Sequence, residues 1–316
     1  MNQISSTPSN TAGLGAALMV VASLAFAGTN VLQSVLPWQF GMSSTGMAFW
    51  QYVIASILAL PLILRIGVHN LRTKKPLAHE VRAFVSALGV HVFVYGFASG
   101  VPIWQMVTLL ATGPLFIILG STLFLHERAT PQRLGAALVG FAGAIIISGV
   151  GSEGLSWATL IPIAAAALWA TTDVLTKYLA RQESPETMTI SLLVLMTPNH
   201  LLILLAVNAL AWLLPSGVAT GFPFALPTGN GLLLLLLLGA LTAFAQYLLS
   251  FAYKVADATY LQPFGDLKVP LSGLLGWICL SQVPGILFWP GAVLILAASS
   301  YILWSESQNP ERLSFA

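Results

Sequence analysis

Long apolar runs separated by short polar segments dominate the pattern of this chain. A membrane-spanning helix needs about 20 consecutive, mostly apolar residues, and ten runs approach or exceed that length. The pattern therefore predicts an all-α membrane protein with ten transmembrane helices. The expected spans are residues 13–35, 45–64, 82–99, 101–125, 132–150, 156–180, 187–214, 230–253, 258–280 and 285–304. Internal prolines in the fourth and ninth runs predict that these two spans are the least regular.

The composition agrees with a chain that lies mostly within a lipid bilayer. Hydrophobic residues make up 57% of the chain and charged residues 7%, whereas soluble domains carry about 25% charged residues. Basic residues lie in short loops rather than in one patch, so nothing indicates a nucleic-acid partner. Because Arg65 is the first charged side chain, no basic segment precedes the first run, and we expect that run to be retained as a span.

The positions of lysine and arginine predict the orientation of the chain. With a cytoplasmic N-terminus, eleven of the twelve basic residues lie in cytoplasmic loops or at the cytoplasmic ends of spans. The twelfth is Lys268, inside the ninth run, and the five opposite loops hold none. Since cytoplasmic loops are enriched in basic residues, we expect a multi-pass protein of a bacterial-type inner membrane with both termini in the cytoplasm.

The two halves of the chain repeat a short pattern. Phe-Ala-Gly-Thr-Asn-Val-Leu at residues 26–32 in the first span corresponds to Trp-Ala-Thr-Thr-Asp-Val-Leu at residues 169–175 in the sixth. Pro114 likewise corresponds to Pro270. Five spans in each half turn the second copy upside down, and inverted repeats with matching broken helices are typical of secondary transporters. The predicted repeats are residues 13–150 and 155–305.

The turn after the fourth span carries a motif that a known family shares. Glu127, Arg128, Gln132 and Gly135 are similar to the Glu-Arg, Gln and Gly pattern of EamA repeats in the drug/metabolite transporter superfamily. The second half departs from this pattern, because Gln282 stands near the position of the acid and no arginine follows. Within the superfamily the chain is most similar to the YddG-type aromatic amino-acid exporters. This resemblance implies alternating access through a midplane cavity and export of aromatic and other neutral amino acids.

Two charged side chains lie near the middle of the ninth run. Asp266 and Lys268 stand between Pro263 and Pro270, beside Gly265. A charge at the centre of a span costs roughly 2.5 to 3.5 kcal/mol on insertion scales. We therefore expect Lys268 to bind a substrate carboxylate, with Asp266 as its partner or as a proton carrier. The alternative is a buried structural pair between the two, which needs local unwinding, since residues two apart on a helix point to different faces.

Further polar and aromatic positions are candidates for gating or for lining the cavity. We expect Asp173 to gate together with its repeat mate Asn30, and Pro114 and Pro270 to act at the hinges. The alternative for Asp173 is an ion pair with Lys177, four residues further along the helix. Aromatic and amide side chains could stack flat rings and bind polar groups, although packing or an interfacial belt is the alternative for each. These candidates are His91, Tyr95, Trp104, Trp169, Gln246, Tyr260 and Gln262.

The sequence contains no HExxH, G-x-S-x-G, CxxC or nucleotide-binding loop, which argues against an enzyme and against a metal or other cofactor. It predicts a secondary transporter of a small neutral metabolite, and leaves proton coupling and the oligomeric state open. Import of a phosphorylated metabolite would need two or more cations within the membrane, and drug-cation export would need a glutamate facing the cavity. An intramembrane enzyme and a non-transporting receptor are the alternatives from other classes.

Overall fold

The computed structural model describes residues 8–67, 73–98, 106, 109–127, 130–148, 157–209, 225–281, 283 and 285–307. These residues form helices and connecting turns, and contain no strand. Within them, six helices are long and apolar enough to cross a membrane, and shorter apolar helices accompany them. The predicted all-α membrane fold is confirmed.

The first half of the chain supplies the elements of the first five predicted spans. They are α1 (Pro8–Phe40), α2 (Ser44–Leu58), α3 (Leu60–Ile66), α4 (Pro76–Ala98), the 3₁₀ turn η2 (Leu110–Thr112), α6 (Gly113–Gly120), the π-helical turn η3 (Ser121–Leu125) and α7 (Pro131–Ser148). The fourth span changes from 3₁₀ to α to π geometry, which agrees with its predicted irregularity.

The second half supplies the remaining five spans. They are α8 (Trp157–Ala180), α9 (Pro185–Ala209), α10 (Asn230–Val255), α11 (Ala258–Gly265) with α12 (Lys268–Leu280), and α13 (Phe288–Ser307). Several span ends differ from the prediction by a few residues. The third span, for example, begins at Pro76 rather than at residue 82, and the polar side chains of His79 and Arg82 near its start are buried.

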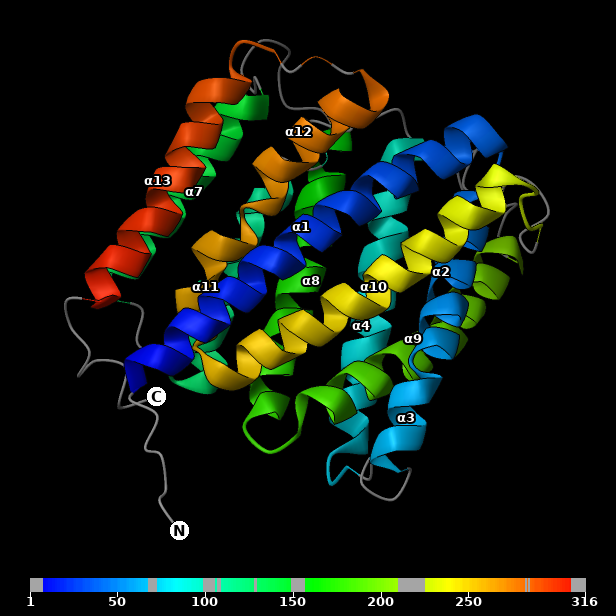
Figure 1. Cartoon of the computed structure of the whole chain (residues 1–316), viewed down its shortest axis with the longest axis horizontal. Coiled ribbons are helices and arrows are strands. Elements are labelled where there is room, and N and C mark those ends of the chain that lie inside the picture. The colour runs from blue at the N-terminus through cyan, green and yellow to red at the C-terminus, as the bar shows by residue number, and fades with distance from the viewer. Residues whose placement is uncertain are drawn as a thin grey trace.

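Helix packing links the two halves crosswise (Figure 1). The first-half helix α1 packs along α10, and its second-half counterpart α8 packs along α4. In the same way α12 of the broken ninth span packs on α1, while α6 of the fourth span packs on α8. The helices α7 and α13 form a pair at one side of the molecule. Each contact between helices thus corresponds to a contact between the equivalent helices of the other repeat, which is the arrangement of an inverted repeat.

The ninth span is broken where its glycine and prolines predict. The helix α11 ends at Gly265 and α12 begins at Lys268, so Asp266 and Leu267 lie in the turn between them. Pro270 is the third residue of α12, where a missing N–H costs little because the first turn of a helix has no intrahelical acceptor.

The side chain of Ser23 in α1 stabilises this break. Its hydroxyl donates to the carbonyl of Phe264 at 2.9 Å and lies 3.3 Å from the carbonyl of Gly265. A helix end leaves its last carbonyls without intrahelical donors, and such groups are costly away from water. A hydroxyl from a neighbouring span therefore allows an interrupted helix to exist inside the bundle.

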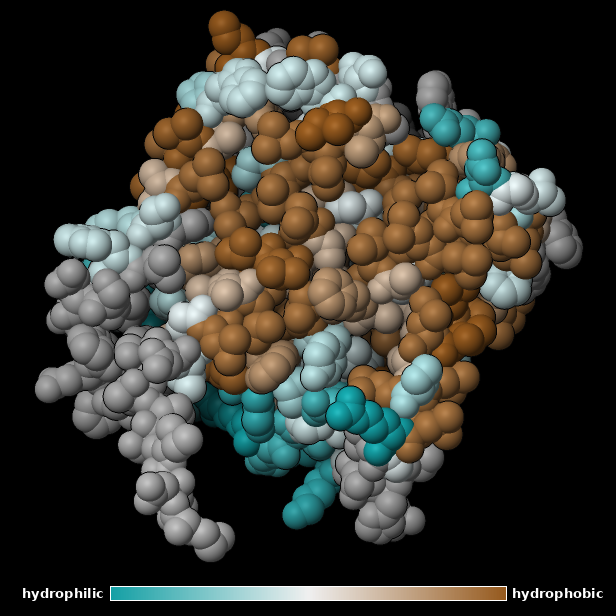
Figure 2. Space-filling view, in the orientation of Figure 1, coloured by the Kyte–Doolittle hydropathy of each residue, from teal (hydrophilic) through white to brown (hydrophobic). Residues whose placement is uncertain are grey.

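The surface shows where lipid and water meet the molecule. Figure 2 shows hydrophobic side chains spread across the helices and hydrophilic side chains gathered at the lower end, where α8 ends and α9 begins in Figure 1. The basic residues Lys74, Lys75 and Lys254 stand at the ends of segments that meet there. We call this end of the molecule the basic end. A continuous apolar belt is the surface expected to face lipid.

Candidate functional site

A cavity lies between the two halves, beside the interruptions in the fourth and ninth spans. It contains about 1200 Å³ of space between protein atoms, including the part open to solvent. Leu110 and Gly113 bring the fourth span to its wall, and Gly265 and Lys268 bring the ninth. The irregular backbone of both broken spans therefore borders a cavity, as membrane proteins require.

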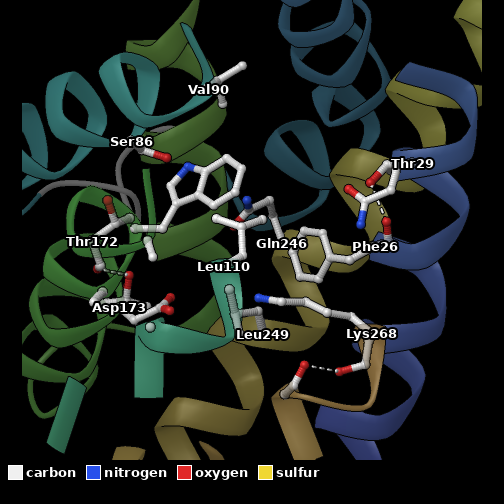
Figure 3. A pocket seen from close by; sticks show the side chains of 18 of the residues that line it. Phe26, Thr29, Ser86, Val90, Leu110, Thr172, Asp173, Gln246, Leu249 and Lys268 are labelled. Carbon is white, nitrogen blue, oxygen red and sulfur yellow. Dashed lines mark hydrogen bonds between the residues drawn. The ribbon is translucent and has the colours of Figure 1, made fainter. Parts of the chain in front are cut away.

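Three charged side chains face this cavity. Lys268 at the start of α12 interacts electrostatically with Asp266 in the preceding turn and with Asp173 in α8. Figure 3 shows Lys268 and Asp173 extending toward one another from opposite sides. In the part of the chain that the structure describes, Lys268 forms no direct ion pair with either carboxylate. The ammonium is thus placed between two acids without being bound tightly to one of them.

The alternative interpretation of Asp173 as an ion-pair partner of Lys177 is wrong. The Lys177 ammonium lies 3.5 Å from the Asp257 carboxylate and donates to the carbonyl of Ala256 at 2.7 Å. Asp173 instead has a hydrogen-bonding contact with Tyr253 of α10. The four-residue spacing is compatible with a pair along the helix, but α10 and the turn after it supply partners that a local pattern does not contain.

Two aromatic side chains approach the cavity from opposite walls. Trp169 comes from α8 and Phe26 from α1, at equivalent positions of the two repeats. The indole of Trp169 packs on the Phe93 ring at 5.1 Å between centroids. It also lies over Gly89, where an added Cβ would stand 2.8 Å from the indole. Gly89 therefore allows α4 to approach the tryptophan that forms one wall.

Amide side chains form a third part of the lining. Gln33 of α1, Gln51 of α2 and Gln246 of α10 all line the cavity and are buried. Sequence reasoning found Gln246 but missed Gln33, Gln51 and the aromatic residue Phe26. An uncharged amide inside an apolar run was the signal that could have identified the two glutamines.

Several predicted site residues lie away from the cavity. Among the described residues, His91, Tyr95 and Tyr260 do not belong to its lining. His91 bonds instead to the fully buried His200 at 3.0 Å, and Tyr260 packs in a core cluster where its ring contacts Phe264. Trp104 and the side chain of Gln262 lie outside the described residues.

The gating candidates stand beside the broken spans. Asn30 lines the cavity, and its side-chain nitrogen donates to the Ser272 hydroxyl of α12 at 3.2 Å. Pro270 is buried near the start of α12, and Pro114 is the second residue of α6, with its side chain outside the described part. These positions agree with a role at hinges, and that role stays a prediction.

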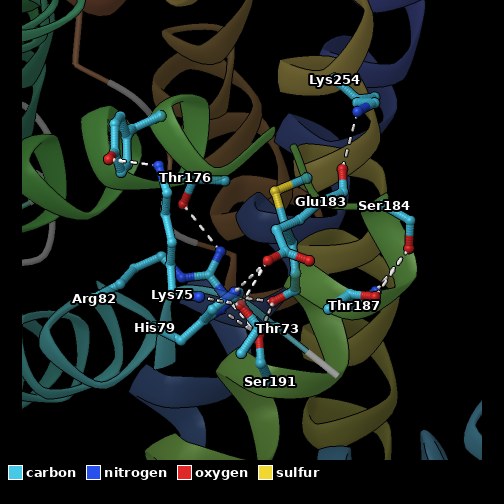
Figure 4. A network of polar contacts seen from close by, with 12 residues as sticks. Thr73, Lys75, His79, Arg82, Thr176, Glu183, Ser184, Thr187, Ser191 and Lys254 are labelled. Carbon is cyan, nitrogen blue, oxygen red and sulfur yellow. Dashed lines mark hydrogen bonds and ion pairs between the residues drawn. The ribbon is translucent and has the colours of Figure 1, made fainter. Parts of the chain in front are cut away.

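A separate polar network joins α4, α8 and α9 at the basic end (Figure 4). Arg82 is fully buried and donates to the carbonyl of Met188, to the Thr176 hydroxyl and to Ser191. His79 joins the network through Ser191 at 2.7 Å. Sequence reasoning assigned Arg82 only to the cytoplasmic end of a span. Its partners come from helices about a hundred residues away, so no local pattern could have shown them.

A bundle of helical spans around a cavity with charged groups is the architecture of a membrane transporter. The model of the EamA-like transporter family matches residues 13–149. A riboflavin transporter of Rhizobium johnstonii is 43% identical over 313 residues, which is 99% of this chain and 98% of that protein. The chain therefore belongs to the EamA-like transporter family, within the drug/metabolite transporter superfamily.

Two further comparisons extend this result. An S-adenosylmethionine uptake transporter of Rickettsia felis is 27% identical over 271 residues, 86% of each protein. A crystal structure with 19% sequence identity superimposes with a TM-score of 0.66, covering 96% of this chain and 98% of that one. The latter likeness concerns the fold alone. Neither named relative is described as an amino-acid exporter.

Proposed function

We propose that this protein transports riboflavin through its central cavity. The observation that carries the proposal is full-length similarity to a riboflavin transporter, 43% identical across 99% of the chain. Aromatic amino-acid export, which the sequence resemblance implied, shares one feature with this proposal. Both substrates carry a flat ring that aromatic side chains can contact. The named relatives lend no support to the amino-acid part of that expectation.

The lining of the cavity suits the chemistry of riboflavin. A flavin is a flat, uncharged ring system that carries a polyol chain. Trp169 of α8 and Phe26 of α1 both line the cavity and offer faces for a ring, and stacked aromatic pairs are favoured at centroid distances of roughly 4.5 to 7 Å. Lys268, Asp173 and Asp266 offer donors and acceptors for hydroxyl groups. One ammonium beside two carboxylates does not suit a phosphorylated flavin, because a dianion needs an excess of positive charge.

The repeat architecture supports alternating access as the transport mechanism. In our proposal the halves at residues 13–150 and 155–305 rock against one another, and the breaks at Pro114 and Pro270 act as hinges. The proposal places both termini in the cytoplasm, and the lysine residues at the basic end support this orientation. The network around Arg82 would then hold the cytoplasmic end closed in one of the two states.

We also propose that a proton accompanies the transport cycle. Two carboxylates, Asp173 and Asp266, face the single ammonium of Lys268, and like charges in one site favour protonation of one of them. Tyr253 is a further titratable group beside these acids, since it forms a hydrogen bond with Asp173. An inside-alkaline or inside-acid pH gradient imposed on proteoliposomes should change the rate of riboflavin uptake, and an unchanged rate would exclude coupling.

A second candidate substrate is S-adenosylmethionine, which carries a net positive charge at neutral pH. The excess of carboxylate over ammonium in the cavity favours it, and the Rickettsia felis relative is named for it. Uptake of labelled riboflavin, flavin mononucleotide, S-adenosylmethionine and phenylalanine by proteoliposomes of the purified protein would separate the candidates. We expect uptake of riboflavin, and little uptake of the other three. Uptake of S-adenosylmethionine without riboflavin would overturn the proposal.

A further inference from the structure

A row of buried polar side chains connects α1, α2 and α10 along one side of the cavity. It consists of Gln33, Gln51, Thr242 and Gln246, and we call it the amide wall. All four residues line the cavity, and each is at most 9% exposed. Buried amide groups are costly unless they are hydrogen-bonded, so a wall of this kind needs partners within the protein or on a ligand.

The direction of hydrogen bonding along the wall follows from its Thr242 end. The Thr242 hydroxyl donates to the carbonyl of Leu238 at 2.7 Å, so it can only accept from the Gln51 side-chain nitrogen, 2.8 Å away. The Gln51 amide oxygen then accepts from the Gln33 nitrogen at 3.0 Å. This order leaves the Gln33 amide oxygen without a protein donor among the described residues, as a free acceptor on the cavity lining.

Gln246 adds a second amide group to the wall. Its side chain interacts with the Tyr52 hydroxyl, and the Tyr52 ring is held by stacking on His200 at 4.8 Å between centroids. Figure 3 shows the Gln246 side chain beside Phe26, and Trp169 lines the same cavity. One side of this amide is thus held by Tyr52, and the group also lines the cavity that Trp169 and Phe26 border.

We propose that the amide wall recognises the pyrimidinedione edge of the flavin ring, an inference that rests on the proposed function. That edge presents an imide N–H between two carbonyl groups, and a carboxamide presents the complementary acceptor and donor. With this edge at Gln33 and Gln246, the ring lies between Trp169 and Phe26. The polyol then reaches Lys268, whose ammonium donates to its hydroxyl oxygens, and Asp173, whose carboxylate accepts from its hydroxyl groups. The wall sets specificity, and the aromatic residues supply much of the contact area.

This arrangement predicts discrimination against a flavin without the imide hydrogen. A methyl group on the imide nitrogen removes the donor and leaves buried amide oxygens without a partner. Sites with buried polar groups reject ligands that cannot pair with them. In contrast, loss of the polyol, as in lumiflavin, leaves the edge unchanged and removes contacts only at the charged end of the cavity.

Binding of riboflavin and 3-methylriboflavin to the purified full-length protein tests the inference, with quenching of flavin fluorescence as the readout. Wild type should bind riboflavin roughly tenfold more tightly than 3-methylriboflavin. The variant Gln246→Leu should lose roughly tenfold in riboflavin affinity and little in 3-methylriboflavin affinity, so that the preference disappears. Gln33→Leu should change the preference in the same direction. Asp173→Asn should weaken riboflavin binding and leave lumiflavin binding unchanged.

A matched control is Gln182→Leu, because Gln182 is exposed in the turn after α8 and should keep the wild-type preference. Equal binding of both flavins by wild type overturns the inference, and so does an unchanged preference in folded Gln246→Leu and Gln33→Leu proteins. The wild-type comparison decides the matter even if both variants fail to fold. If the protein transports riboflavin but does not discriminate against 3-methylriboflavin, this inference alone is wrong. If it neither binds nor transports riboflavin, the proposed function is wrong as well.

Discussion

The side-chain nitrogen of Asn30 in α1 lies 3.2 Å from the Ser272 hydroxyl oxygen in α12. This bond joins the unbroken first span to the second part of the broken ninth span, one turn beyond Lys268. A hydrogen bond at this position couples α1 to any movement of α12 about the break.

We expect Asn30→Ala to slow riboflavin uptake several-fold while the protein remains folded. A neutral hydrogen bond contributes about 0.5 to 1.5 kcal/mol, which is enough to shift a two-state conformational equilibrium but too little to unfold the bundle. The measurement is initial uptake in proteoliposomes together with the melting temperature. Ser34→Ala is the control, since among the described residues the Ser34 hydroxyl bonds within its own helix, to the carbonyl of Val31. Wild-type uptake by Asn30→Ala would show that this contact does not affect transport.

Replacement of Trp169 tests the aromatic wall. We expect Trp169→Ala to lower riboflavin affinity roughly tenfold, because an aromatic pair contributes about 0.5 to 1.5 kcal/mol beyond the buried area. Trp169→Phe should restore part of the affinity. Fluorescence titration measures both, and Trp289→Phe on the exposed face of α13 is the control. If Trp169→Ala binds riboflavin as wild type does, the ring lies elsewhere.

Lys268 is the cation between the two carboxylates of the cavity. We expect Lys268→Met to reduce riboflavin transport at least about tenfold, because it leaves Asp173 and Asp266 without their shared positive charge. Lys254→Met is the control, because it makes the same substitution at a lysine outside the cavity. Lys254 donates to the backbone carbonyls of Ala180 and Glu183 at the basic end. Comparable loss in both variants would indicate a general effect of removing a lysine.

The close approach of α7 and α13 gives a prediction about stability. A Cβ added at Gly143 would lie 2.6 Å from the carbonyl oxygen of Gly291, whereas one added at Gly135 meets nothing within 4 Å. Gly143→Ala should therefore cost roughly 1 to 3 kcal/mol of stability, the usual effect of overpacking. Gly135→Ala should be neutral or slightly stabilising, because alanine favours a helix. Thermal unfolding in detergent compares the two, and equal melting temperatures would contradict this packing.

The sequence predicted the spans well because apolar length and basic loops are local properties of the chain. It also located the interruption of the ninth span, since Gly265 and Pro270 act on their own backbone. What it could not provide were partners from distant helices. The network around Arg82 and the bond between His91 and His200 both join residues about a hundred positions apart. Each is decided by tertiary packing.

The candidate site was predicted in part for the same reason. Charged residues inside an apolar run stand out, and Asp173, Asp266 and Lys268 all face the cavity. Neutral residues stand out less, so Gln33 and Gln51 were missed. His91 and Tyr260 are residue types that are common in binding sites, yet both pack away from the cavity. A side chain in a span can face the cavity, another helix or lipid, and its residue type alone does not decide which.

The central claim is that the cavity between the two halves is the path of riboflavin. Filling it offers the most direct test, because Ala170 lines the cavity while Ala164 is exposed on the same helix. In proteoliposomes of folded protein, Ala170→Phe should abolish uptake of labelled riboflavin, and Ala164→Phe should retain it. Wild-type uptake by Ala170→Phe would place the path outside this cavity.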